Sequence, residues 1–165
     1  MKSIKPLWYL TVLGLFLLTI SFTLGRKRLK DWMLVYLFIS FTASLIGSVV
    51  AGKKYIIYPV RFLSESFKSS VLFDYLLLPI TCVIYNQITK YKSFSPSMLF
   101  AFIFTIPMSA IELYFERKTK YIEYVRWNIF YTFTSMTITF WISKLFTMVL
   151  NRLKNNQELG KTTHN

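Results

Sequence analysis

Three ionisable residues interrupt the apolar stretches of this chain: Asp74, Glu112 and Lys144. Charged groups are unfavourable inside hydrocarbon, so those that remain there mark candidate sites for proton transfer or cation binding. Two carboxyl groups that lie close together can share a proton or hold a cation, because their negative charges repel. Lys144 stands apart from this pair, since it lies six residues before the end of its stretch at Leu150 and its flexible stem is expected to reach the surface.

The sequence offers no other recognisable catalytic or metal-binding pattern. The single histidine, His164, lies in the polar C-terminal segment, and the single cysteine, Cys82, has no second thiol with which to pair. A histidine triad, a zinc site and an intrachain disulfide are therefore excluded. The five glycines form neither a phosphate-binding nor a dinucleotide-binding loop. We expect no enzymatic activity, no cofactor and no metal.

The two carboxyl groups are predicted to lie at similar depth. The short connection 90–97 makes the apolar stretches on either side of it antiparallel neighbours. Asp74 lies 16 residues before Lys90 and Glu112 lies 15 residues after Ser97, about 24 and 22 Å from one surface at 1.5 Å per residue. The two groups could therefore meet. Alternatively both reach only the head-group region, because each lies within four residues of the end of its stretch.

Further polar residues accompany this pair. Thr81 and Tyr85 project within about 20° of Asp74 on a helix, which predicts a polar stripe of the kind that joins helices. Asn86 lies about 120° from the stripe and is expected to bond to another helix. A basic residue between the two carboxyl groups is an alternative that would keep them ionised. The basic residues on that side are Arg61, Lys68, Arg117 and Arg126.

The composition of the chain predicts a multi-spanning membrane protein. Of its 165 residues, 54% are hydrophobic and 16% are charged, and the mean hydropathy is +0.43. The charge is strongly basic, with 20 lysines and arginines against 7 acidic residues. These basic residues separate apolar runs instead of forming one face, which argues against binding of nucleic acid.

Five apolar stretches are long enough to cross a bilayer as helices, which takes about 20 residues. They are residues 7–24, 32–51, 71–89, 98–115 and 128–150. Their continuous apolar character favours helices over barrel strands. The sequence therefore predicts an all-α membrane protein: one domain, 1–150, built as a bundle of about five transmembrane helices. A short polar tail, 151–165, is expected to fray.

The loops add two expectations. After Pro59, apolar residues recur at helical spacing and predict an amphipathic interfacial helix over 59–70 whose cations contact anionic lipid head groups, or alternatively a helical lead-in to the third stretch. Basic residues number ten on the amino-terminal side of a five-span bundle and nine on the other, a difference too small to orient it. The cations that follow the first stretch favour an external amino terminus.

Several short motifs are distributed along the chain. They are Tyr58-Pro59-Val60-Arg61, Phe73-Asp74-Tyr75-Leu76-Leu77-Leu78-Pro79, Tyr85-Asn86-Gln87, Glu112 and Tyr124-Val125-Arg126-Trp127. On these motifs the chain, from about Leu7 to Phe146, resembles an uncharacterised family of small multi-spanning membrane proteins from spore-forming bacteria. The resemblance implies a bacterial cytoplasmic membrane and a shared Asp, Asn-Gln, Glu and Trp set, and it names no substrate or reaction. The candidate polar site is then Asp74, Glu112, Asn86, Tyr85, Arg61, Arg126 and Trp127.

Two functions remain at this point. The favoured one is a non-enzymatic accessory, assembly or envelope-associated component that acts through lipid contacts and through helix contacts with another membrane protein or a second copy. The alternative is a small oligomeric transporter or channel in which Asp74 and Glu112 carry a proton or bind a cation. The absence of an internal repeat counts against transport.

Overall fold

The computed structural model describes residues 5–59, 70–119 and 121–162, and within these ranges the chain is almost entirely helical. The α-helices are α1 (Lys5–Leu24), α2 (Leu29–Gly52), α3 (Leu78–Ile88), α4 (Phe94–Lys118) and α5 (Ile129–Thr162). A short 3-10 helix, η1 (Arg26–Arg28), precedes α2, and a π-helical segment, η2 (Phe73–Leu77), precedes α3. Strands β1 (Ile56–Ile57) and β2 (Glu123–Tyr124) pair antiparallel. The predicted all-α class is confirmed.

Within the described residues, three helical segments are long and apolar enough to cross a membrane. They are Arg26–Gly52, Phe94–Lys118 and Ile129–Asn156, whereas the apolar part of α1, Trp8–Thr23, is shorter. Large apolar side chains on these helices face outward, as Phe41 of α2 and Ile103 of α4 do with exposures of 65% and 60%. An apolar outer surface is unfavourable in water and natural in lipid, so the chain has the surface of a multi-pass membrane protein.

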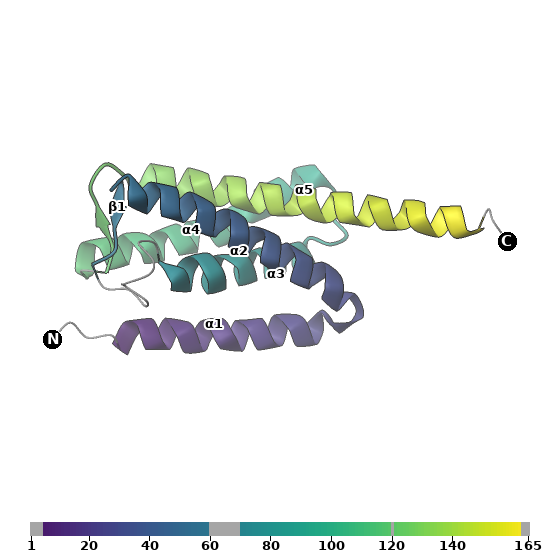
Figure 1. Ribbon diagram of the computed structural model, residues 1–165, viewed down its shortest axis with the longest axis horizontal. Coiled ribbons are helices and arrows are strands. Elements are labelled where there is room, and N and C mark those ends of the chain that lie inside the picture. The colour runs from purple at the N-terminus through teal and green to yellow at the C-terminus, as the bar shows by residue number, and fades with distance from the viewer. Residues whose placement is uncertain (1–4, 60–69, 120, 163–165) are drawn as a thin grey trace.

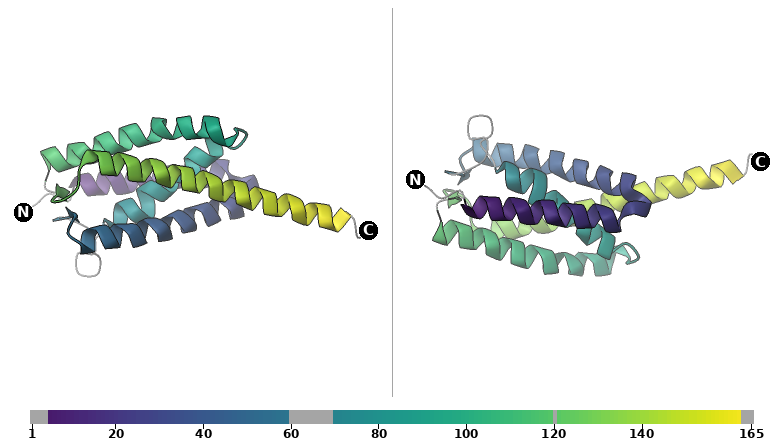
Figure 2. Two further views of the ribbon diagram at one scale, coloured as in Figure 1. Left: turned by 90° about the horizontal axis from the view of Figure 1, so that it is seen from above. Right: turned by 90° about the horizontal axis from the view of Figure 1, so that it is seen from below.

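The shortest helix, α3, lies at the centre of the bundle and contacts each of the other four helices. Its residues Ile80, Cys82, Val83 and Tyr85 are fully buried. Helix α1 lies to one side and packs mainly on α3 and η2 (Figure 1). In the view from below, α1 covers α3 and runs between the projections of α2 and α4 (Figure 2). The core is therefore organised around α3, with α1 as its outer cover.

The π-helical turn η2 follows from Pro79. Proline has no amide hydrogen and its ring collides with the carbonyl four residues earlier, which here belongs to Tyr75. Widening the turn relieves this collision, and insertions of this type are common in distorted helices. The Tyr36 hydroxyl of α2 donates to the Tyr75 carbonyl oxygen at 2.5 Å and replaces the missing amide. A side chain of α2 thus satisfies the backbone at the start of α3.

The two ends of the bundle differ. The β1–β2 pair joins the end of α2 to the connection between α4 and α5, and Ile56 is paired with Tyr124. At the opposite end α5 runs past the bundle (Figure 1). Helix α5 continues to Thr162, so the expectation of a frayed tail after residue 150 is wrong. The predicted interfacial helix at 59–70 lies almost wholly outside the described residues.

We expect Tyr36→Phe to lower the free energy of unfolding by about 1 kcal/mol, because the Tyr75 carbonyl loses its donor. The loss should shrink in a Pro79→Ala background, where alanine restores an amide that can donate to this carbonyl. Thermal denaturation in detergent micelles measures both effects. Tyr114→Phe, which removes an exposed hydroxyl, is the matched control. An equal loss in both backgrounds would show that Pro79 does not free the carbonyl.

Candidate functional site

Asp74 and Glu112 lie on the wall of one cavity of about 310 Å³. Asp74 comes from η2 and Glu112 from the last two turns of α4. The cavity is completed by residues of α2, α5 and the β1 loop, and its wall is mainly apolar. The structure therefore brings together the two carboxyl groups whose predicted depths are similar. We call this space the acidic cavity.

Glu112 is held by two hydroxyl groups. Tyr124 donates to its Oε1 atom at 2.7 Å and Thr132 donates to the same oxygen at 2.8 Å. The indole of Trp127 in turn donates to the Thr132 hydroxyl at 2.9 Å. Both donors to Glu112 are neutral, and within the described part of the chain no hydrogen bond reaches its second oxygen, Oε2. The network fixes the carboxyl group without neutralising a negative charge on it.

Asp74 is buried against the backbone of α2. Gly47 leaves room for it, because a Cβ atom at position 47 would lie 2.6 Å from the Asp74 Oδ2 atom. Tyr58, which follows β1, lines the same cavity. Burial raises the pKa of the Tyr58 phenol, and the nearby charges of Glu112 and Asp74 raise this pKa further. The pKa of Tyr58 is therefore sensitive to the negative charge of both carboxyl groups.

Tyr124, which lies in β2 and so outside the helices, is also affected by the charge of Glu112. Burial raises the pKa of the Tyr124 phenol, and the charge of Glu112 adds to this effect. A phenol that stays protonated remains a hydrogen-bond donor to the carboxylate. The site thus combines two carboxyl groups, two phenols and one indole with mostly apolar walls. Such a set can hold a cation or a shared proton.

Tyr85 and Asn86 lie in the core and not in the acidic cavity. The Tyr85 ring packs edge-on against Phe104 and Phe140, and its hydroxyl donates to the Ser97 carbonyl at 2.9 Å. Asn86 donates to the Ser143 hydroxyl of α5 at 2.9 Å, an interhelical bond of the kind that the sequence predicts. The predicted stripe joining Asp74 to Tyr85 is wrong, because η2 inserts a wide turn between them and breaks the 100° spacing.

The other residues predicted to belong to the polar site are Trp127, Arg126 and Arg61. Trp127 belongs to the network through Thr132. Arg126 is exposed, and its backbone amide donates to the Tyr55 carbonyl at 3.2 Å. Arg61 lies outside the described residues. Among the described residues, no arginine or lysine bonds to Glu112.

Lys144 does not extend to the surface, which corrects the expectation from the sequence. It is 3% exposed, and its Nζ atom donates to the Thr89 carbonyl at 2.6 Å. Thr89 follows the last residue of α3, where helix carbonyls lack intrahelical partners and the helix dipole favours a cation. Because α3 ends inside the bundle, these carbonyls lie within reach of Lys144. Its role here is to cap α3.

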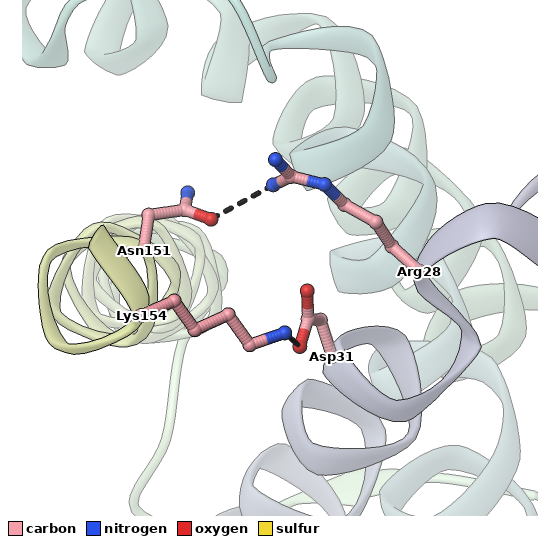
Figure 3. A network of polar contacts seen from close by, with 4 residues as sticks. All are labelled: Arg28, Asp31, Asn151 and Lys154. Atoms are coloured by element: carbon pink, nitrogen blue, oxygen red, sulfur yellow. Dashed lines mark hydrogen bonds and ion pairs between the residues drawn. The ribbon is translucent and has the colours of Figure 1, made fainter. Parts of the chain in front are cut away.

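A second polar cluster was not predicted. Asp31 in the first turn of α2 is buried and pairs with Lys154 on the extension of α5 (Figure 3). Beside this pair, Arg28 donates to Asn151 at 2.8 Å (Figure 3). Arg28, at the end of η1, and Asp31 are three positions apart, as are Asn151 and Lys154 on one face of α5. The signal for this cluster in the sequence is Asp31, the acidic residue in the first turn of α2. It indicates a basic partner on residues 151–162 only if these residues are recognised as helix.

We expect Lys154→Met to lower the free energy of unfolding by about 1–2 kcal/mol, since the buried Asp31 carboxylate loses its cation. The loss is smaller than for a fully buried pair because Lys154 is half exposed. Amide hydrogen exchange over residues 151–162 should accelerate in the same variant. Arg152→Met, which removes a neighbouring exposed cation, is the control. Equal exchange in the two variants would contradict the role of the pair.

Comparisons of the chain with protein-family models, with curated proteins and with solved structures find no match. The molecule combines a mostly apolar cavity that holds two carboxyl groups, an apolar exterior and basic loops at both ends.

Proposed function

We propose that this protein is a five-helix integral component of a bacterial cytoplasmic membrane and acts by binding, without catalysing a reaction. In this arrangement α1 and the η2–α3 segment cross the bilayer together with the three longer helices. The protein works through lipid contacts and through helix contacts with a second membrane protein or a second copy. The apolar exterior and the small share of chain outside the helices support this proposal.

One observation favours binding over transport: buried apolar side chains pack the core of the bundle around α3. The side chains of Ile80, Tyr85 and Phe140 in this core have no exposed surface. A conducting path needs polar groups or water along its whole length, since an ion does not cross a packed apolar core. The packed core therefore favours a protein that binds a ligand over one that conducts an ion.

Transport remains the second candidate because Asp74 and Glu112 share one cavity. In a transporter the two carboxyl groups would carry a proton or a cation between alternating conformations. The packed core around Tyr85 would then have to open during each cycle. Two experiments test the membrane arrangement and the choice between these functions.

Cysteine labelling tests the five-span arrangement. In a Cys82→Ser background, Lys53→Cys and Glu123→Cys should react with an impermeant maleimide from one side of the membrane, and Lys27→Cys and Lys92→Cys from the other. The reason is that these positions lie at opposite ends of the helical bundle. Labelling of Lys53→Cys and Lys92→Cys from the same side would show that α3 does not cross. Release of the protein by carbonate washing would contradict membrane integration altogether.

Proton flux into proteoliposomes separates binding from transport. We expect no pH-driven flux above empty vesicles for the wild type or for the Asp74→Asn, Glu112→Gln double variant, because the packed core blocks a path. Circular dichroism of the reconstituted proteins controls for folding. A flux that is present in the wild type and lost in the folded double variant would establish the transporter instead.

A further inference from the structure

One end of the bundle gathers basic side chains from three separate parts of the chain. The connection from α1 to α2, the connection from α3 to α4 and the part of α5 that runs past the bundle all lie at this end (Figure 1). The segments concerned are 25–31, 90–97 and 151–156, and they contain eight lysines and arginines but a single acidic residue, Asp31. This carboxylate is buried and paired with Lys154. It therefore leaves the other cations of the three segments without a matching negative charge from these segments.

Several of these cations are held in place by neighbouring side chains. The Lys90 Nζ atom donates to the Tyr91 hydroxyl at 3.0 Å and lies 4.7 Å from the centre of the same ring. The Lys92 Nζ atom lies 4.5 Å from the centre of the Phe100 ring. Arg28 is held by its hydrogen bond to α5. Because these groups are already ordered, binding an anion costs them less conformational entropy.

Tyr91 shows that the first two basic segments lie close together. Its side chain is 90% exposed, and the hydrogen bond from Lys90 together with the charge of Lys90 lowers the pKa of its phenol. The charges of Arg28 and Lys27, which belong to η1, lower this pKa further. Like charges that converge in this way repel each other, and an anion between them relieves the repulsion. We call the surface formed by Lys27, Arg28, Lys90 and Tyr91 the basic patch.

The basic patch lies where the apolar surface of the bundle ends. Leu29, which directly follows Arg28, is 40% exposed, and Ile88, two residues before Lys90, is 53% exposed. Exposed apolar side chains favour lipid chains, whereas exposed cations favour anionic head groups. A change from one to the other within one or two residues places the basic patch at the level of the lipid phosphates.

We propose that the basic patch binds the phosphate group of an anionic phospholipid whose head group carries no amine. The phosphate would bridge η1 and the start of the α3–α4 connection, and the acyl chains would extend past Leu29 and Ile88. Arg28 suits this role because a guanidinium can form two parallel hydrogen bonds with a phosphate. This proposal rests on the membrane function proposed above. It names the class of lipid that the protein would bind there.

The charges around the basic patch select against a zwitterionic head group. An ammonium group beside the phosphate would be repelled by the cations that the phosphate does not neutralise. It would also find no free carboxylate in the three segments, since Asp31 already pairs with Lys154. A net anionic head group meets neither difficulty.

Lipid titration of the detergent-solubilised full chain, followed by native mass spectrometry, tests the proposal. The probes are phosphatidylglycerol and phosphatidylethanolamine with identical acyl chains, and glycerol 3-phosphate alone. We expect phosphatidylglycerol to bind about tenfold more tightly than phosphatidylethanolamine, and an Arg28→Gln, Lys90→Gln double variant to lose most of this preference. A Lys53→Gln, Lys118→Gln double variant removes the same charge from exposed positions at the other end and should keep the preference.

A second double variant keeps the test decisive if the first does not fold. Lys27→Gln, Lys90→Gln leaves the bond between Arg28 and Asn151 in place and should also lose the preference. The proposal is overturned by equal binding of the two lipids to the wild type, by equal losses in the variants of the two ends, or by glycerol 3-phosphate that binds as tightly as phosphatidylglycerol.

The outcome also separates this inference from the proposed function. If the protein resists carbonate washing and the preference for phosphatidylglycerol is absent, only this inference fails. If carbonate washing releases the protein, the proposed membrane function fails first.

Discussion

Backbone groups inside a bilayer have no water to bond with, so each must find a partner within the protein. The short central helix α3 is where this requirement is hardest to meet. Pro79 leaves the Tyr75 carbonyl without an amide at its start, and the last turn leaves the Thr89 carbonyl open at its end. Tyr36 of α2 satisfies the first carbonyl and Lys144 of α5 satisfies the second. The two neighbouring helices thus complete α3 from both sides.

The π-helical turn η2 that accommodates Pro79 also shapes the acidic cavity. The π turn that accommodates Pro79 changes the direction of residues 73–77 relative to the rest of α3, and it directs Asp74 to Gly47 of α2. The absence of a side chain at Gly47 lets the carboxyl group pack against the helix backbone. Glu112 then faces the same space from α4 and is fixed by hydroxyl groups at the start of α5 and in β2. A local backbone constraint therefore positions the polar residues of the site.

Features that depend on local composition could be predicted from the sequence. The apolar stretches predicted the bounds of the helices to within a few residues, except at the end of α5, which continues to Thr162 instead of ending at Leu150. Counting along these stretches placed Asp74 and Glu112 at similar depth. Features that depend on distant contacts could not. The π turn moves Tyr85 out of the expected stripe. Lys144 donates to the Thr89 carbonyl at the end of α3 instead of reaching the surface. Asp31 pairs with Lys154, which lies 123 residues away in the sequence. In each case the partner is set by packing, which helical periodicity does not encode.

Acidic and basic residues occupy different parts of the molecule. The chain has only 7 acidic residues, and two of them, Asp31 and Asp74, are buried, while Glu112 lines the acidic cavity. Basic residues instead occupy the loops and helix ends, where Arg117, Lys118 and Arg126 are exposed. The boundary of the bundle is therefore positive and its chamber negative. Such a distribution of charge attracts cations toward the acidic cavity and anions toward the surrounding loops.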